Sequence, residues 1–411
     1  MTHNTKQWLW RWHIIAGIIC LPIVLLLSIT GGVYLFKDQY EASSIEKLKQ
    51  VSNTTASRLT YQEQWDIVNN HWDITPTGII IPENNNEATQ FISGRFSHKS
   101  SLFIDPYSGK INGQIKQNET NMHQVRKLHG ELLMGSFGTK IIELIASWMI
   151  VLILSGIYVF WPKKGSYKSL IIIRLNKGKR TLFRDLHTVI GFWFSIILLV
   201  ILAGGLPWTD VFGNGFKWVQ KQTNTGYPTE WKAPKLQSSE SNTKRLTLDD
   251  IIEQANQLNL DGETQITWSK SLTNAFSISN QTSNLSKLHK YHINPFTGKI
   301  LYHGTWDNIG VFMKTRLYVM AFHQGQFGYW NWCLVLITTV ALFFLCLSAL
   351  FSYLYKRQKG TWGVPPAQHT YRVGKPIVGS LVLLGLLLPM FGLSLLCIYI
   401  ITLYSKNRIS H

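Results

Sequence analysis

The stretch RWHIIAG at residues 11–17 leads into an uncharged apolar run that reaches Phe36, and DLHTVIG at residues 185–191 leads into a second one that reaches Leu206. In both stretches a histidine precedes a glycine by four residues, so the two share one face of a helix. The first run closes with TGG at 30–32 and the second with AGG at 203–205. These matching starts and ends predict an internal repeat.

Three further apolar runs are long enough to cross a bilayer, which takes about 20 residues. Residues 141–161 carry only Glu143, and residues 330–355 and 377–404 carry no charge. The sequence therefore predicts about five transmembrane helices, at 13–36, 139–161, 187–206, 330–355 and 376–404. Pro389 predicts a kink in the fifth, or its division into two half-helices.

Lysine and arginine set the expected orientation. The loops 162–186 and 356–375 are short and strongly basic, with Asp185 as their one acid. By the positive-inside rule both loops and the N-terminus, residues 1–12, are cytoplasmic. Residues 37–138 and 207–329 then lie outside, in the periplasm of a bacterium whose inner membrane holds the chain. The basic tail 405–411 leaves the side of the C-terminus open. Much of the net charge of +18 reflects this topology, so no nucleic-acid partner is expected.

The two external segments repeat one pattern. LFIDPYSGKI at 102–111 and YHINPFTGKI at 291–300 each predict a β-hairpin with a Pro/Gly turn. Amphipathic stretches at 61–71 and 248–258 precede the hairpins and predict one helix each. The expected fold is an all-α membrane bundle with a two-fold internal repeat and two α+β external domains. Because the four cysteines all lie in or beside apolar runs, no disulfide framework is expected in those domains.

A second pair of histidines precedes the even-numbered helices, in KLHG at 127–130 and AFHQG at 321–325. His129 stands eight residues before a Phe-Gly pair and His323 only four. The difference is one helical turn, which keeps the face but changes the depth in the membrane.

The paired hairpins, the His-x3-Gly starts and the Leu-His-Gly together resemble the PepSY-associated transmembrane family over roughly residues 7–404. This family includes PiuB-like proteins and FoxB-type inner-membrane ferrisiderophore reductases. The resemblance implies PepSY domains outside the membrane. For the reductase branch it implies two b-type haems between the helices.

Four histidines are the candidate axial ligands of haem iron: His13 with His187 at the cytoplasmic side, and His129 with His323 at the outer side. Haem needs two axial ligands from facing helices, and neutral imidazole supplies them. Gly17 and Gly191 would give a porphyrin clearance one turn inward, and Arg11 and Arg184 would meet its propionates. Interfacial histidines satisfied by water or headgroups remain the alternative, and the turn offset leaves the outer pair the more open of the two.

The remaining motifs give weaker indications of function. His123 has no counterpart in the second repeat and is expected at the surface; His289, His292 and His303 are expected there too, or against an iron chelate. Glu143 is expected at a helix start or snorkelling to the interface. Aromatic walls for a large chelate are expected from Trp65, Trp72, Trp208, Trp218, Trp231 and Trp306, with core residues or interfacial anchors as the alternative for several of them. There is no Cys-x-x-Cys-His, P-loop or Rossmann fingerprint, so covalent haem and a nucleotide cofactor site are not expected.

The function expected from these residues is a dihaem b-type oxidoreductase. It would pass electrons from a quinol or separate donor to a periplasmic ferric siderophore or other ferric chelate, releasing Fe(II). Two rivals stay open: a non-enzymatic PepSY protein that binds or inhibits a partner such as a protease, and an iron-chelate transporter.

Overall fold

The computed structural model describes residues 3–51, 56–95, 98–162, 166–235, 245–269, 274–358, 360–361, 363–364 and 373–409. Parts of both basic loops therefore lie outside the described residues. The chain divides into two compact units. The membrane unit comprises Met1–Leu35, Val125–Val219 and Arg316–His411, and the sheet unit comprises Phe36–Gln124 and Gln220–Thr315.

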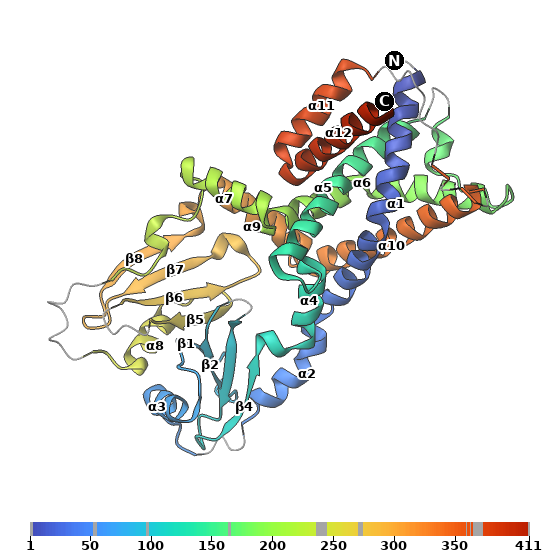
Figure 1. The fold of residues 1–411 in the computed structure, drawn as a ribbon. Coiled ribbons are helices and arrows are strands. Elements are labelled where there is room, and N and C mark those ends of the chain that lie inside the picture. The colour runs from blue at the N-terminus through green and yellow to red at the C-terminus, as the bar shows by residue number, and fades with distance from the viewer. Residues whose placement is uncertain are drawn as a thin grey trace. The chain divides into compact units, whose positions relative to one another are not determined.

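Four helices of the membrane unit are long and apolar enough to cross a bilayer. They are α1 (His3–Tyr34), α5 (Gly135–Phe160), α6 (Lys179–Gly205) and α10 (Tyr329–Lys356). Helices α1 and α6 each pack against both α5 and α10 (Figure 1). The chain is therefore a membrane-embedded helical protein, and four of the expected spans correspond to single helices.

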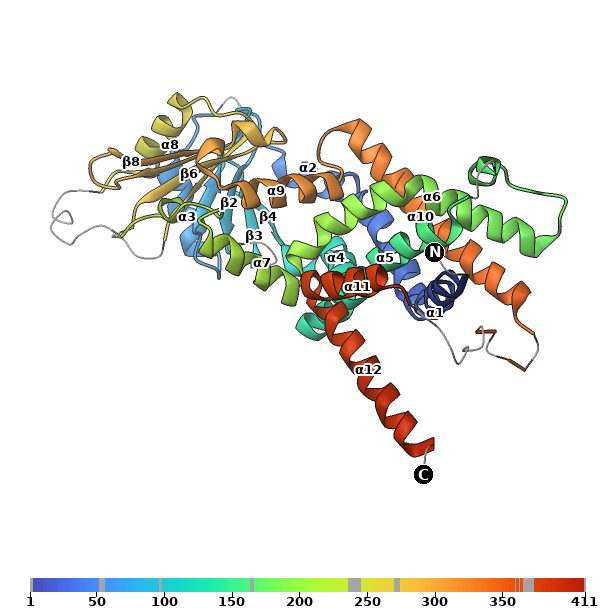
Figure 2. The same ribbon diagram turned by 90° about the horizontal axis from the view of Figure 1, so that it is seen from above.

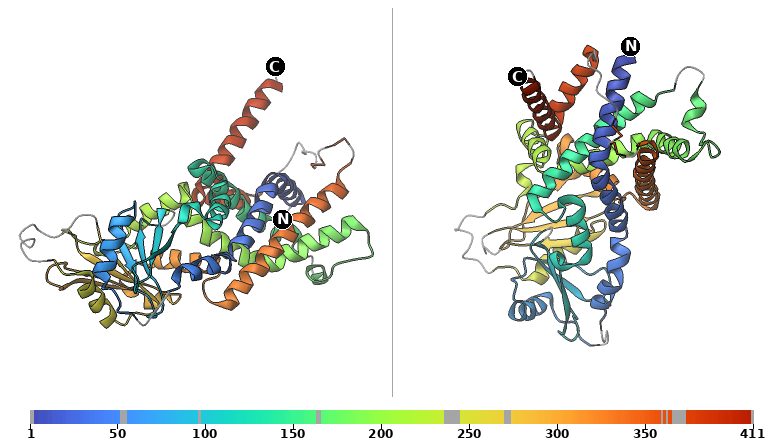
Figure 3. Two further views of the ribbon diagram at one scale, coloured as in Figure 1. Left: turned by 90° about the horizontal axis from the view of Figure 1, so that it is seen from below. Right: turned by 45° about the vertical axis from the view of Figure 1, so that its right-hand side comes forward.

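The fifth apolar run forms two helices, α11 (Lys375–Leu387) and α12 (Pro389–Ile409), and no single kinked span. Leu388 between them has φ −120° and ψ 87°, outside the helical region, because the residue before a proline is driven away from it. The backbone of Gly385 and that of Gly392 approach too closely for a Cβ on Gly392. The two helices form a V (Figures 2 and 3).

Shorter helices flank the long ones: α4 (Asn121–Glu131) precedes α5, α7 (Val211–Gln222) follows α6, and α9 (Val311–His323) precedes α10. Glu143 of α5 is fully buried and accepts hydrogen bonds from the backbone N–H groups of Val211 and Phe212, at 2.8 and 2.9 Å. Its carboxylate therefore stabilises the positive N-terminal end of α7. Glu143 lies neither at the start of its own helix nor at the interface, so the prediction for this residue was wrong: its partner is the start of a different helix.

The sheet unit contains one eight-stranded antiparallel sheet in the order β4-β3-β2-β1-β5-β6-β7-β8 (Figure 1). The strands are β1 (Gly78–Ile80), β2 (Thr89–Ser93), β3 (Ser100–Ile104), β4 (Ile111–Lys116), β5 (Glu263–Thr267), β6 (Phe276–Gln281), β7 (His289–Ile293) and β8 (Ile300–Thr305). Each external segment contributes four consecutive strands. The junction is β1 against β5, where Ile79 pairs with Ile266.

Two helices pack on the sheet, α3 (Tyr61–His71) and α8 (Leu248–Gln257), and each begins with a capping box, from Thr60 and from Thr247. One hydrophobic core holds both, since Val68 of α3 and Ile251 of α8 belong to the same buried cluster. The two external segments, expected as separate domains, thus form one structural unit. The physical reason is that β1 would otherwise be an unpaired edge strand.

Both predicted hairpins are present, as β3–β4 and β7–β8. Asp105 and Asn294 hold the turns by accepting backbone hydrogen bonds from residues two and three positions later. Gly109 and Gly298 follow with φ of 70° and 71°, a conformation that favours glycine. The repeated sequence therefore produces repeated turns.

Candidate functional site: two histidine pairs in the membrane unit

The structure brings together the four histidines that the sequence singled out, in the expected pairs. His13 of α1 and His187 of α6 have ring centroids 6.3 Å apart, with an angle of 75° between the ring planes. His129 of α4 and His323 of α9 also lie 6.3 Å apart, at 66°. The two pairs are hereafter the inner pair and the outer pair.

The inner pair lines a cavity among α1, α5, α6 and α10, with about 890 Å³ of empty space including its mouth. Gly17 and Gly191 line the same cavity, as the repeat predicted. A Cβ at Gly17 would meet no atom within 4 Å. The remaining walls are mainly apolar side chains, among them Val24, Leu198, Leu342 and Phe160. This apolar lining is typical of a site for an organic cofactor or ligand.

The outer pair is held at the opposite ends of the same helices. Gly31 of α1 lies beside His129, and Gly205 of α6 beside His323; a Cβ on them would come within 3.1 and 3.6 Å of the respective imidazole Cε1 atoms. Along α1, His13 and Gly31 are separated by roughly 27 Å at the rise of an α-helix. This is close to the thickness of the hydrocarbon core of a bilayer.

The turn offset between the two halves does not separate the outer pair. After His129 the chain leaves the helix through Leu132 and Leu133, which have φ of 48° and 58°, before α5 begins. After His323 the corresponding connection uses Gly325 and Gly328 with positive φ. In both halves the next long helix begins six residues after the histidine, at Gly135 and at Tyr329. The offset therefore concerns only the Phe-Gly pair, which lies inside α5 in the first half and before α10 in the second, and not the depth of the histidine.

Each of the four imidazoles uses Nδ1 for a hydrogen bond. His187 donates from Nδ1 to the Leu345 carbonyl at 3.2 Å, and His323 to the Ile201 carbonyl at 2.8 Å. A carbonyl oxygen only accepts, so in both rings Nδ1 carries the proton. Nε2 of these two rings is therefore the free electron-pair donor.

The first-half histidines use hydroxyl groups instead. Nδ1 of His13 lies 3.0 Å from Ser155 Oγ, and Nδ1 of His129 lies 3.0 Å from Thr30 Oγ1. Both hydroxyls donate their own proton to a carbonyl in the preceding turn of their helix, Ser155 to Leu152 and Thr30 to Leu26. Their oxygens consequently accept from the imidazoles, and Nε2 is again left free. Neither Ser155 nor Thr30 was predicted as a site residue, since small hydroxyl residues are common in membrane helices.

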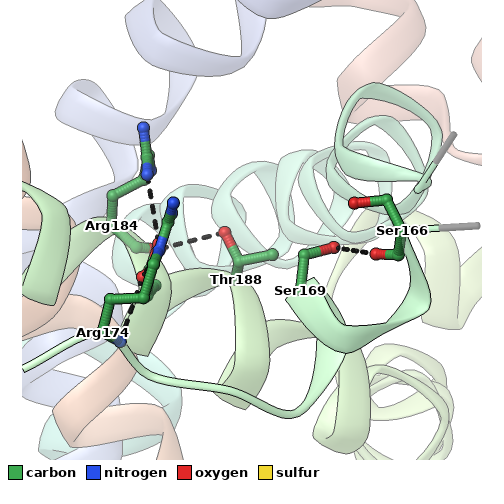
Figure 4. A network of polar contacts seen from close by, with 6 residues as sticks. Ser166, Ser169, Arg174, Arg184 and Thr188 are labelled. Atoms are coloured by element: carbon green, nitrogen blue, oxygen red, sulfur yellow. Dashed lines mark hydrogen bonds and ion pairs between the residues drawn. The ribbon is translucent and has the colours of Figure 1, made fainter.

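The predicted arginine partners differ in their surroundings. Arg184 lies 3.3 Å from Asp185, which Arg174 also binds through two nitrogens (Figure 4). Arg11 stands two residues before His13 on α1, and among the described residues its buried Nε has no hydrogen-bond partner. Neither Arg11 nor Arg184 lines the inner cavity. Arg11 is therefore the better placed of the two to receive an anionic group.

These observations fit haem. Two imidazole nitrogens bound to one metal ion at about 2 Å each leave their ring centroids roughly 6 Å apart. Ligand histidines characteristically donate the other ring N–H to a carbonyl or similar acceptor, which fixes the tautomer. No group of three or more metal-ligating side chains occurs in the described part of the chain, whereas haem iron needs only two axial ligands.

The other histidines have different surroundings from those expected. His123 is 4% exposed and His292 is fully buried, so the surface interpretation was wrong for both. His292 contacts Ser277 Oγ and the Glu230 carbonyl. His289 and His303 do lie at or near the surface, stacked on one another with ring centroids 5.4 Å apart.

The predicted aromatic residues also differ in their surroundings. Trp72 and Trp306 are core residues of the sheet unit, each 7% exposed. Trp218 is 63% exposed and lies in the membrane unit. Trp65 lines a pocket of the sheet unit.

The four long helices form a membrane-embedded arrangement with a histidine pair near each end. Two segments of the chain, inserted between these helices, together form one α+β unit. The chain belongs to the family described as the PepSY-associated TM region, whose model matches residues 10–357. The resemblance inferred from the sequence motifs is thereby confirmed. A comparison with curated proteins gives no match.

Proposed function

We propose that this chain is a dihaem b-type oxidoreductase of the bacterial inner membrane. It takes electrons from a quinol or separate donor and reduces a ferric chelate, such as a ferrisiderophore, in the periplasm. The observation that carries the proposal is the recurrence of one arrangement at both ends of the bundle: two imidazoles 6.3 Å apart, each with its Nδ1 engaged in a hydrogen bond. The enzyme class, the cofactor and the acceptor are all part of this proposal.

When bound, haem supplies a redox centre that accepts and releases one electron. The protein's own residues bind it and set its environment. His13 and His187 would hold the iron of an inner haem, and His129 and His323 that of an outer one. Gly17 would leave room for a flat macrocycle against the helix backbone, whereas Leu345 already lies 3.4 Å from a Cβ at Gly191. The buried Nε of Arg11 would be a donor for a propionate.

The apolar walls of the inner cavity exclude water and thereby lower the local dielectric constant. A low dielectric constant disfavours the charged form of a redox centre and so helps to set its potential. The helices α1 and α6 carry contacts to both pairs, so the two sites are spaced by rigid elements across the bilayer. Such spacing suits electron transfer from one side to the other.

The proposed topology follows from the basic loops: N-terminus and loops 162–186 and 356–375 in the cytoplasm, sheet unit in the periplasm. Its two segments are inserted between α1 and α5 and between α6 and α10, which puts both on the same side. The acceptor chemistry is that siderophore oxygen donors hold Fe(III) far better than Fe(II). One electron therefore suffices to labilise the metal, and Fe(II) and the free chelator leave.

The first experiment is an absorption spectrum of the purified protein in detergent. The expected result is red protein with a low-spin bis-histidine b-type spectrum and two haems per chain. The matched control is the variant with all four histidines changed to alanine, which should be colourless. Colourless wild-type protein after expression with added haem precursor would overturn the proposal.

The second experiment tests the acceptor. Chemically reduced protein should be reoxidised by a ferrisiderophore, with Fe(II) captured by a ferrous-specific chelator. Haem that stays reduced with every member of a panel of ferric chelates would contradict the reductase assignment while leaving the haem assignment intact.

A further inference from the structure

A second pocket lies wholly within the sheet unit, between α3 and α8 at the ends where these helices begin. It holds about 590 Å³ of empty space including its mouth. Its lining residues are Gln62, Trp65, Arg245, Leu246, Thr247, Leu248, Trp268 and Phe276. Three large aromatic side chains and one arginine thus face one small volume.

The arginine of this pocket has unused donors. The Arg245 guanidinium stacks over the Phe276 ring, 4.7 Å from its centroid. Its Nε and Nη2 are buried, and among the described residues neither has a hydrogen-bond partner. Burial lowers the pKa of this guanidinium, although an arginine remains charged. A buried cation with two unsatisfied N–H groups is costly unless something pairs with it.

The membrane unit contains an arginine whose Nε and Nη2 both have a carboxylate partner. Arg174 binds Asp185 through Nε at 2.7 Å and Nη2 at 2.8 Å, one nitrogen to each carboxylate oxygen. These are the two nitrogens left unpaired in Arg245. The parallel N–H bonds of this edge match the spacing of two carboxylate oxygens.

The internal repeat provides a second comparison. Arg58 stands at the position equivalent to Arg245, in the repeated Arg-Leu-Thr that precedes each helix. Its Nη1 donates to Asn85 at 3.0 Å and its Nη2 to the Tyr61 hydroxyl at 3.2 Å, while its Nε, like that of Arg245, is buried with no hydrogen-bond partner among the described residues. The two arginines thus differ at Nη2, which is paired in Arg58 and unpaired in Arg245. The first repeat therefore engages this arginine within the protein, whereas the second leaves it facing a pocket.

The neighbouring groups favour an anion with an aromatic body. Among the described residues, Trp65 Nε1 in the pocket wall is also buried without a hydrogen-bond partner. Asp249 is engaged by the backbone N–H groups of Tyr61 and Gln62, at 2.8 and 2.9 Å, so its charge is directed to the start of α3. Trp65 and Trp268 offer ring faces and edges for stacking.

We infer that the sheet unit binds a small aryl carboxylate in this pocket. The carboxylate pairs with Nε and Nη2 of Arg245, and the aromatic body lies between Trp65, Trp268 and Phe276. This inference does not rest on the haem proposal, since the pocket contains no residue of either histidine pair.

The test uses the full chain in detergent, with 2-naphthoate as the probe and isothermal titration calorimetry as the measurement. Wild-type protein should bind 2-naphthoate, and the neutral 2-naphthamide should bind at least about ten-fold more weakly because it cannot satisfy the charged fork. Arg245→Gln should weaken 2-naphthoate binding by at least about ten-fold, and Arg245→Lys should not restore it. The matched control, Arg58→Gln, removes the same charge at the equivalent position and should change the affinity by less than about two-fold.

Several outcomes would overturn the inference: no binding of 2-naphthoate at millimolar concentration, equal binding of acid and amide, or equal losses in the Arg245 and Arg58 variants. The acid-against-amide comparison uses only wild-type protein, so it stands even if Arg245→Gln fails to fold. Haem content should be the same in the wild type and in a folded Arg245→Gln, which keeps this test separate from that of the proposed function.

Discussion

The two halves of the chain hold their histidines at matching positions by different chemistry. In the first half, His13 and His129 lie against side-chain hydroxyls, those of Ser155 and Thr30. In the second half, His187 and His323 donate to backbone carbonyls.

The helix positions correspond closely: Ser155 matches Ser348, which donates to the Leu345 carbonyl at 2.9 Å, and the same carbonyl accepts from His187. The comparison teaches that corresponding helix positions set where an imidazole lies, whereas the acceptor of its Nδ1 proton differs between the halves even where both carry a serine.

The largest expected effect concerns the inner pair. His13→Ala and His187→Ala should each remove one haem, about half of the total, because loss of one axial ligand leaves a weakly held five-coordinate iron. Haem per chain, measured as the pyridine haemochrome, checks this. His71→Ala, an exposed histidine on α3, is the matched control and should keep full haem content. Unequal losses from the two inner variants would break the equivalence of the halves.

The outer pair tests whether the same equivalence reaches the other end of the bundle. His129→Ala and His323→Ala should each remove the other haem while the inner one is still reduced by dithionite. They should also abolish reoxidation by a ferric chelate, since the outer site is the one proposed to face the acceptor. Haem content that stays complete in both variants would assign the outer histidines a structural role.

How far the sequence predicts this arrangement depends on the range of the interactions. The histidine pairs, the hairpins and the helices at 61–71 and 248–258 follow from local patterns that occur twice, so each half supports the other. Counting residues to the Phe-Gly pairs predicted an offset of one turn, because the count cannot reveal that Leu132 and Leu133 adopt positive φ and end the helix, so that α5 begins six residues after His129 as α10 does after His323. For non-glycine residues this conformation is uncommon and has no strong sequence signal.

Local sequence patterns do not predict which distant strands pair. The β1–β5 contact joins residues nearly two hundred positions apart, and nothing in either strand alone specifies its partner. The division of the fifth run at Leu388 was one of two outcomes that Pro389 allowed. Whether Nε and Nη2 of Arg245 find a partner depends on the residues that pack around it, and no sequence pattern predicts this. The equivalent residue of the first half, Arg58, can be recognised from the repeated Arg-Leu-Thr.

A smaller effect is expected from the hydroxyl groups. Ser155→Ala removes one acceptor of the His13 Nδ1 proton, although the Leu152 carbonyl remains nearby. Loss of such a partner should weaken inner-haem affinity by about ten-fold. Ser348→Ala should change it by less than about two-fold, because the Leu345 carbonyl still accepts from His187. Titration of haem-free protein with hemin gives both affinities, and equal effects would show that the halves do not differ in this way.

The smallest effect should come from Gly156, which packs against His13 where the second half has Ala349. A Cβ at Gly156 would lie 3.1 Å from His13 Cε1, so the imidazole must shift by a few tenths of an ångström. Because Ala349 occupies the equivalent position and lines the same cavity, the bundle accommodates a methyl group there. Gly156→Ala should therefore keep both haems and full stability while moving the midpoint potential or the electron paramagnetic resonance g-values of the inner haem alone. Loss of the inner haem would mean that His13, unlike His187, has no freedom to adjust, and would locate the rigid half of the site in the first repeat.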